Sequence, residues 1–163
     1  MAAAEIVDLN PSIESLPNKA CRAALQFWLD ARGSADLPPL AAIAPHKLPR
    51  ALMPNISVLG VEDGLKRIRF RIVGRAIVEG IGFDPTGTYA DDAPGAEKAI
   101  ARYLACIANR RPYFYEGPLF WQHKEIATYR ALVLPFADPG KPITRIMTYC
   151  EYDWAYGPHM TTA

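Results

Sequence analysis

The sequence predicts an α+β fold in which five antiparallel strands form one sheet, with helices on one face and an N-terminal helix as an extension. Three observations predict it. Residues 56–74 alternate apolar and polar side chains on both sides of Asp63-Gly64, a dipeptide that favours a tight hairpin. Residues 96–109 carry apolar side chains at helical spacing. Three strand candidates follow, at residues 112–121, 126–136 and 143–152. The helices before them connect the hairpin to these strands, so they must cover one face of the sheet.

The composition is typical of one globular domain with an extension. The chain has 163 residues, 50% of them hydrophobic and 21% charged, and a formal net charge of +1. These values argue against disorder and against bulk attraction to nucleic acid. The opening residues are acidic and no apolar run is long enough to span a bilayer, so we expect a cytoplasmic protein without membrane insertion. We divide the chain into an extension at 1–44, a main domain at 45–155 and a tail at 156–163.

The cysteines and histidines are scattered along the chain. Cys21, Cys106 and Cys150 are odd in number and far apart, which predicts reduced and mostly packed thiols. Only His123 and Glu125 form a near pair of possible metal ligands. Because zinc and iron sites need three or four converging ligands, we expect no metal site.

The extension is expected to contain one amphipathic helix. Asn18 can cap a helix over Lys19–Arg32, and Gly33 can end it. The helix carries an apolar stripe that must dock on another surface, and the second face of the sheet is one candidate. We expect the stripe to form a homodimer, because it would otherwise be exposed, and its candidate contact residues are Leu25, Trp28 and Leu29.

Short helical pieces are expected on both sides of the hairpin. Pro49 interrupts or begins one of them, and glycines and aspartates break residues 75–95 into single turns. Asp84, Asp91 and Asp92 are interpreted as helix caps rather than as general acids.

The helix at residues 96–109 has a predicted apolar face that should contact the sheet. Arg102 is placed mostly off this face, and Cys106 is interpreted as a packed thiol on its flank. The residues assigned to the face itself are Ile100, Tyr103, Leu104 and Ile107.

Three motifs in order resemble the PAS superfamily, and in particular its small stand-alone bacterial members. They are Leu48-Pro49-Arg50, then Arg71-Ile72-Val73-Gly74 at the end of the hairpin, then the loop GFDPTG at residues 82–87. The resemblance covers residues 45–152. It implies a five-stranded antiparallel sheet, a helical layer over its concave face and a cavity between them that holds a small ligand in many relatives. It also implies a sensory role in signal transduction, relayed through a dimer partner or a downstream signalling protein.

The sequence lacks the residues that bind the known cofactors of PAS domains. Residues 75–95 contain no cysteine for a cysteinyl flavin. The helix at residues 96–109 has no axial histidine, and the chain has no Cys-x-x-Cys-His motif for haem. The cofactor therefore stays unknown, and a small organic ligand is the expectation.

Candidate ligand-binding residues are the aromatic and apolar side chains of the predicted strands and long helix, together with two arginines. Aromatic hydroxyls could orient a polar ligand, although such rings are more often plain core. An inward arginine could bind a ligand carboxylate or phosphate, although most strand arginines face water or pair with Asp or Glu. The candidates are Phe70, Arg71, Ile72, Tyr103, Ile107, Tyr113, Tyr115, Tyr129, Arg130, Met147 and Tyr149.

Other functions are weaker alternatives. Arg67, Arg69 and Arg71 form a positive stripe, which we interpret as a solvated face rather than a nucleic-acid surface. The chain lacks a phosphate loop, a Gly-x-Ser-x-Gly motif and paired histidines, so we do not expect an enzyme. A small cavity enzyme would need a lone carboxylate with a raised pKa, for which Glu116 and Glu151 are the strand candidates. A ligand-free protein-interaction scaffold is the other alternative.

Overall fold

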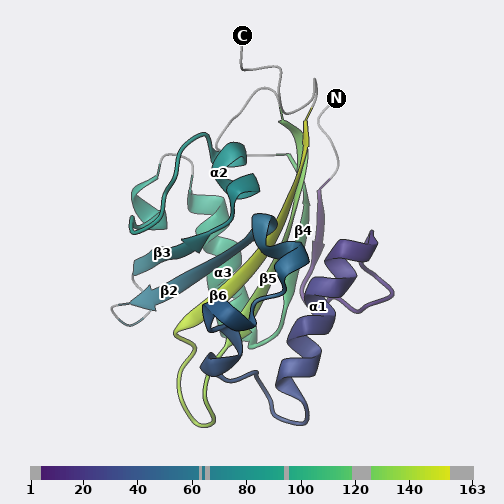
Figure 1. Ribbon diagram of the computed structural model, residues 1–163, viewed down its shortest axis with the longest axis vertical. Helices are drawn as coiled ribbons and strands as arrows, with labels where there is room; N and C mark the ends of the chain where they lie inside the picture. Colours follow the sequence, from purple (N-terminus) through teal and green to yellow (C-terminus); the bar gives the residue numbers. More distant parts are fainter. Residues whose placement is uncertain (1–4, 63, 65–66, 94–95, 119–125, 155–163) are drawn as a thin grey trace.

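A six-stranded antiparallel sheet forms the centre of the computed structural model, which describes residues 5–62, 64, 67–93, 96–118 and 126–154. The predicted α+β class and the antiparallel pairing are confirmed, but the predicted number of five strands is wrong. The strands lie in the order β1 (Ile6–Asp8), β4 (Tyr113–Gly117), β5 (Ile126–Phe136), β6 (Arg145–Trp154), β2 (Ile56–Glu62) and β3 (Arg67–Val73) (Figure 1).

The additional strand, β1, comes from the N-terminal extension. It pairs with β4 so that Ile6 lies opposite Glu116 and Asp8 lies opposite Phe114. Three residues are too few to show an alternating pattern, and Ile6 is 51% exposed, so the sequence carries no strand signal there. The extension therefore contributes to the same sheet as the main domain.

The hairpin of β2 and β3 forms as predicted. Glu62 lies opposite Arg67 and Ser57 lies opposite Val73, with a bulge between Val58 and Leu59. Gly64 has a φ of 61°, the left-handed conformation that a tight turn needs. Asp63 of the predicted turn lies outside the described residues.

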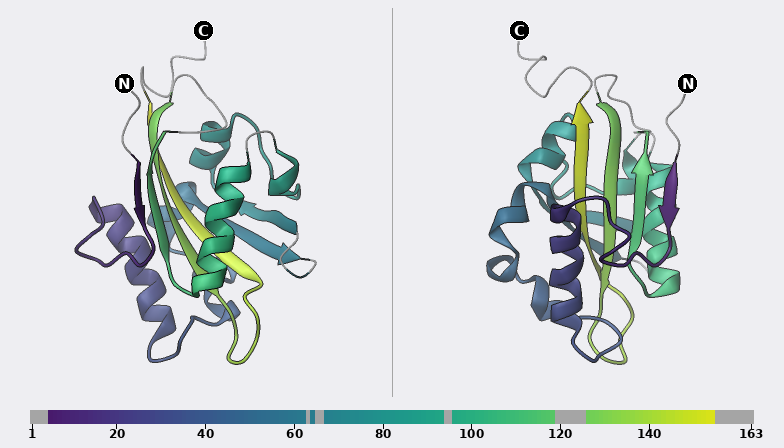
Figure 2. Two further views of the ribbon diagram at one scale, coloured as in Figure 1. Left: turned by 180° about the vertical axis from the view of Figure 1, so that it is seen from behind. Right: turned by 90° about the vertical axis from the view of Figure 1, so that its right-hand side faces the viewer.

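Helices cover both faces of the sheet. One face carries α1 (Lys19–Arg32), and the other carries α2 (Arg75–Ile81), the short η4 (Ala90–Asp92) and α3 (Glu97–Asn109) (Figure 2). Helix α1 has the predicted ends, because Asn18 Oδ1 accepts a hydrogen bond from the Cys21 N–H at 2.9 Å and Gly33 closes the helix with a φ of 56°.

The apolar stripe of α1 packs on the sheet of its own chain. Leu25 and Trp28 are each 1% exposed and Leu29 is half-buried. The Trp28 indole Nε1 donates a hydrogen bond to the Pro135 carbonyl oxygen of β5 at 2.8 Å. The expectation that this stripe would be exposed without a partner chain is therefore wrong. The sheet has a second apolar face, and packing α1 on it buries this face together with the apolar stripe of the helix.

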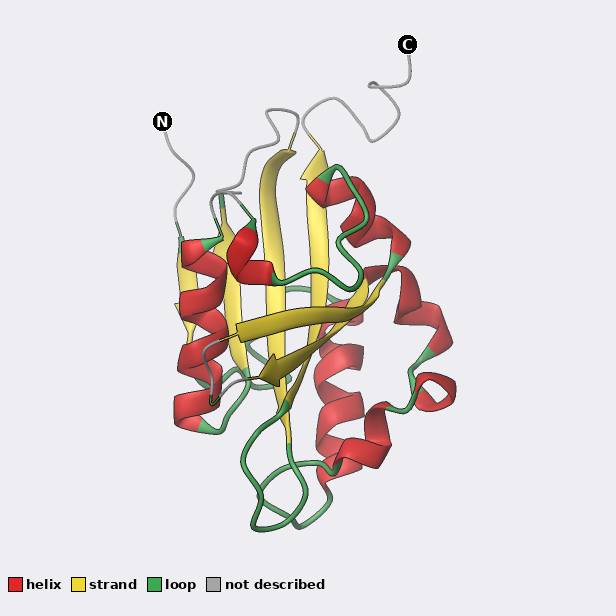
Figure 3. Cartoon of the chain, turned by 90° about the vertical axis from the view of Figure 1, so that its left-hand side faces the viewer, coloured by secondary structure: helices red, strands yellow, loops and turns green. Residues whose placement is uncertain are grey.

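Three short 3₁₀ helices connect α1 to the hairpin: η1 (Leu40–Ile43), η2 (Pro45–Lys47) and η3 (Arg50–Asn55) (Figure 3). The helix predicted around Pro49 is present as η2 and η3 on either side of it. None of the described helices is long and apolar enough to cross a membrane.

The core is centred on β5 and β6. Leu132 and Ile146 are fully buried there, between the helices of the two faces. These two strands separate α1 from the α2–α3 layer, so each of them presents one set of side chains to each layer.

Candidate functional site

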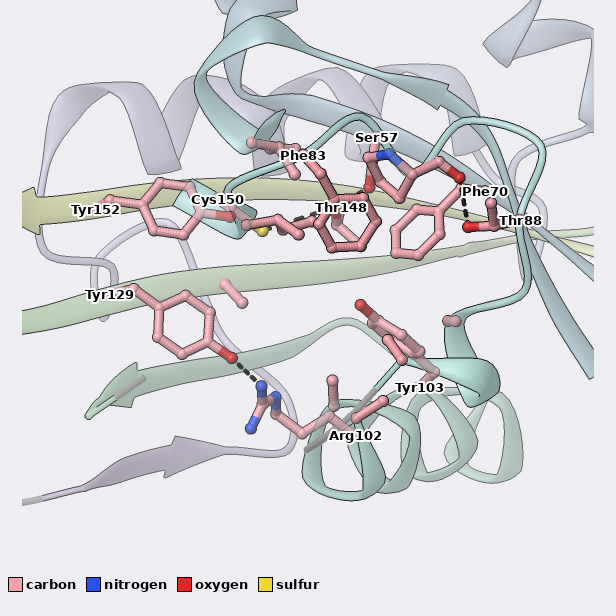
Figure 4. A pocket seen from close by; sticks show the side chains of 18 residues that line it. Ser57, Phe70, Phe83, Thr88, Arg102, Tyr103, Tyr129, Thr148, Cys150 and Tyr152 are labelled. Atoms are coloured by element: carbon pink, nitrogen blue, oxygen red, sulfur yellow. Dashed lines mark hydrogen bonds between the residues drawn. The ribbon is translucent and has the colours of Figure 1, made fainter. Parts of the chain in front are cut away.

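A cavity of about 280 Å³ lies between the sheet and the layer formed by α2, η4 and α3 (Figure 4). Phe83 follows α2, lines the cavity and is 51% exposed. The described lining consists of Ser57, Phe70, Ile77, Ile81, Phe83, Pro85, Thr88, Ala90, Ala93, Ala96, Ala99, Arg102, Tyr103, Tyr129, Ala131, Thr148, Cys150 and Tyr152.

The alternation of β5 and β6 decides which side chains face the cavity. Tyr129 pairs with Tyr152 and Ala131 pairs with Cys150, and all four line the cavity. Arg130, between the two β5 residues, therefore points to the opposite face, toward α1. The stacked rings of Tyr129 and Tyr152 have centroids 5.9 Å apart and form one wall.

Small residues leave the space open. Five alanines line the cavity where larger apolar side chains would fill it. Gly80 lets α2 lie directly on β6, because a Cβ atom there would be 2.5 Å from the Tyr152 Cζ. The cavity therefore depends on small residues in both the helical layer and the sheet, with the alanines at positions Ala90, Ala93, Ala96, Ala99 and Ala131.

Most hydroxyl groups of the lining bond within the protein. Ser57 Oγ and Thr148 Oγ1 share a hydrogen bond, and Thr88 Oγ1 donates to the Pro85 carbonyl oxygen at 2.6 Å. The Tyr103 hydroxyl differs, because it has no hydrogen-bond partner among the described residues. Burial raises the pKa of Tyr103 far above its usual value, so this phenol keeps its proton and can donate to a ligand.

Arg102 of α3 is the one charged side chain of the described lining. It is 6% exposed, its Nη2 donates to the Tyr129 hydroxyl, and its guanidinium carbon lies 4.3 Å from the Tyr115 ring centroid. Its Nε is buried without a hydrogen-bond partner in the described structure. Figure 4 shows Arg102 rising from α3 toward the sheet, with its guanidinium beside the Tyr129 hydroxyl.

The predicted orientation of α3 is wrong at two positions. Arg102 was expected off the apolar face and is buried, whereas Leu104 was expected on it and is 38% exposed. A hydrophobicity pattern treats arginine as a surface residue, so it predicts a helix orientation in which Arg102 faces solvent. The buried positions recur at helical spacing nonetheless, at Ala99, Arg102, Cys106 and Ile107.

Three of the predicted ligand-binding residues line the cavity: Phe70, Tyr103 and Tyr129. Three more lie on the same side of the sheet but outside the lining: Ile107 on α3, and Tyr113 and Tyr115 on β4. By strand register, the others on β3, β5 and β6 lie outside the lining as well, namely Arg71, Ile72, Arg130, Met147 and Tyr149.

Both predicted arginines pair with carboxylates of their own chain. The Arg130 Nε lies 2.7 Å from Glu151 Oε1, and its two terminal nitrogens lie 3.1 Å from Glu116 Oε2 and 2.8 Å from Asp153 Oδ1. The Arg71 Nη2 lies 3.3 Å from Glu62 Oε2. The three carboxylates around Arg130 already satisfy the charge that a ligand would have to satisfy. Arg71 shares its carboxylate with Arg69, whose Nε lies 3.0 Å from the same Glu62 oxygen.

The carboxylates considered for an enzyme are ion-paired. Burial alone would raise the pKa of Glu151, but hydrogen bonds from Arg130, Asn18 and Tyr149 outweigh it, so its pKa lies below the usual value. Glu116 shares Arg130 with it, and neither carboxylate belongs to the described lining of the cavity.

The arginine stripe of β3 also has carboxylate partners, since Arg69 and Arg71 share Glu62 and Arg67 pairs with two aspartates. Arg67 Nε lies 2.6 Å from Asp91 Oδ2, and its Nη2 lies 3.0 Å from Asp92 Oδ2. The interpretation of these two aspartates as helix caps is wrong, because the N-caps of η4 and α3 are Tyr89 and Ala96, and neither helix has a side-chain cap hydrogen bond. Asp84 instead accepts hydrogen bonds from the Thr86 N–H and hydroxyl in a tight turn.

The three cysteines are free and buried. Burial raises the pKa of Cys21 to about 12 and that of Cys150 to about 11, so both remain protonated thiols near neutral pH. Among the described residues no group of three or more His, Cys, Asp or Glu side chains could hold a metal ion. His123 and Glu125 lie outside the described part of the chain.

Comparisons of this chain with protein-family models, with curated proteins and with solved structures found no match. The resemblance to PAS domains therefore rests on the sequence motifs.

Proposed function

We propose that this chain is a PAS-like sensory or regulatory module that binds a small molecule in the cavity between the sheet and the α2–α3 layer. The observation that supports this proposal is a cavity of about 280 Å³ that is lined by alanines and aromatic rings and contains only a few polar groups. An apolar cavity of about 150 Å³ is enough to take up benzene, so a bicyclic ring or a medium-length acyl chain is a reasonable occupant here.

Strand β6 offers a route from the cavity to the opposite face. Cys150 and Tyr152 line the cavity, and Glu151 between them accepts a hydrogen bond from Asn18 Nδ2 at 2.7 Å. Asn18 is the N-cap of α1. A ligand that shifts β6 would therefore change the end of α1, and we propose that the response passes from there to a second copy of the chain or to a partner protein.

The proposal is tested by filling the cavity. Ala99→Leu adds bulk to the lining from α3, and Ala23→Leu makes the same change at an exposed position of α1. The probe is N-phenyl-1-naphthylamine, an uncharged molecule that fluoresces in apolar surroundings. We expect saturable one-to-one binding to the wild type and to Ala23→Leu, with a loss of binding in Ala99→Leu.

Two results would contradict small-molecule binding: no saturable binding to the wild type, or unchanged binding in Ala99→Leu. Either would favour the ligand-free scaffold, in which the aromatic rings close the space themselves. Native mass spectrometry of the freshly purified protein gives an independent reading, because a copurifying mass supports the sensory role.

A further inference from the structure

We infer that the ligand is a small apolar monocarboxylate whose carboxylate group pairs with Arg102. This inference rests on the proposed function, because it names the class of molecule that the same cavity binds. It starts from the charge of Arg102 and from the lack of a matching charge around it.

A buried guanidinium needs an anion. Arg102 is 6% exposed, and arginine does not lose its proton in proteins. The described structure gives it one hydrogen bond, to the Tyr129 hydroxyl, and the faces of the Tyr115 and Tyr129 rings. Neither a neutral hydroxyl nor a ring face cancels a full charge, so the cation remains uncompensated within the described residues.

Arg130 shows what a compensated arginine looks like in the same protein. It lies on the other face of the sheet, among three carboxylates at 2.7 to 3.1 Å. The two arginines thus differ in the one feature that matters for ligand binding. Arg130 has its anions within the chain, whereas Arg102 faces a cavity into which an anion can be brought from outside.

The charge balance of the lining favours a single negative charge. Arg102 is the only ionisable cation among the described lining residues, and no carboxylate accompanies it there. A monocarboxylate would leave the site neutral, and its planar oxygens match the guanidinium fork. A phosphate monoester would bring a second charge into an apolar space without a partner for it.

The rest of the lining selects an apolar body. Beyond Arg102, the surface consists mainly of alanine, isoleucine, phenylalanine and tyrosine side chains. The protonated Tyr103 hydroxyl, which points into the space in Figure 4, is available for one further polar atom of the ligand. The class is therefore an aromatic or medium-chain carboxylic acid.

The test compares acids with their uncharged amides of the same shape. Isothermal titration at neutral pH measures octanoate against octanamide and 2-naphthoate against 2-naphthamide, on the full chain. We expect at least one acid to bind about ten to a hundred times more tightly than its amide, the range of one charge-assisted hydrogen-bonded contact.

Variants then assign the preference to one residue. In Arg102→Met the acid should lose this advantage while the amide keeps its affinity, and Arg102→Lys should keep part of it because the charge remains without the fork. Arg22→Met, at an exposed position of α1, is the matched control and should bind like the wild type. Even if Arg102→Met does not fold, the comparison of acid and amide on the wild type tests whether the cavity prefers a carboxylate.

The outcomes separate this inference from the proposed function. Equal affinities for acid and amide, binding of the uncharged fluorescent probe alone, or a preference that survives in Arg102→Met would each overturn the carboxylate class and leave small-molecule binding intact. Failure of the probe, the acids and the amides together would overturn both.

Discussion

Removing the Trp28 indole tests whether α1 is part of the domain or a surface for a second chain. Trp28 is 1% exposed and its Nε1 donates to the Pro135 carbonyl oxygen at 2.8 Å. Loss of a buried tryptophan costs about 3–5 kcal/mol of folding free energy. Against a typical total of about 5–15 kcal/mol, Trp28→Ala should lower the melting temperature by roughly 6–20 °C.

Milder changes separate the contributions. Trp28→Phe keeps most of the ring but leaves the Pro135 carbonyl without its donor, so we expect a loss of about 1–3 kcal/mol. Arg22→Ala, exposed on the same helix, is the control and should change stability by less than about 0.5 kcal/mol. Urea unfolding followed by tryptophan fluorescence and circular dichroism gives these differences.

The same unfolding curves contain the result that would refute the reasoning. If α1 packs on its own sheet, the midpoint should not change across about a hundredfold range of protein concentration. A wild-type midpoint that rises with concentration, together with a concentration-independent midpoint in Trp28→Ala, would show that the stripe is an intermolecular contact instead.

Two further predictions concern the two faces of the sheet. Arg130→Met should destabilise the protein by about 1–3 kcal/mol at neutral pH, because it removes the shared cation of Glu116, Glu151 and Asp153, whose side chains are 25%, 16% and 49% exposed. Hydrogen bonds from Arg130 lower the pKa of Asp153, and the pKa of Glu151 is also lowered, so the stability they give is present above an unfolded pKa of about 4 and is lost as pH falls further. The gap between wild type and variant in urea midpoint should therefore shrink below about pH 4, and a constant gap would argue against the network. On the cavity side, Gly80→Ala should cost about 1–3 kcal/mol by pushing α2 off the Tyr152 ring, and additivity with Tyr152→Ala in a double-mutant cycle would contradict that contact.

Local signals predicted the elements whose ends are decided by neighbouring residues. The N-cap of α1 at Asn18 and its end at Gly33 depend only on residues within or next to the helix, so the sequence predicts both. The predicted bounds of β5 are the observed ones, Ile126–Phe136. Strand β1 gave no such signal because it is three residues long and exists through its pairing with β4.

The site was harder to predict because its chemistry depends on tertiary partners. The prediction included Arg71 and Arg130, but Arg71 pairs with Glu62 and Arg130 pairs with three other carboxylates, and these contacts join separate strands. Arg102 was passed over because a charged residue in an amphipathic helix is exposed by default. A usable signal was present all the same: Ala99, Arg102 and Cys106 share one helix face, and two of these three are small and compatible with burial.

The position of Arg102 also bears on how the proposed ligand would act on the rest of the protein. In the described structure its cation is held only by the Tyr129 hydroxyl and by ring faces of Tyr115 and Tyr129. Tyr129 stacks on Tyr152, and Tyr152 directly follows Glu151, which holds the N-cap of α1 through Asn18. An anion that takes over the guanidinium would therefore release a group bonded to the strand pair that also positions α1. If Arg102 binds the ligand as proposed, binding and response would share one set of contacts, because Arg102 also donates a hydrogen bond to Tyr129 of β5.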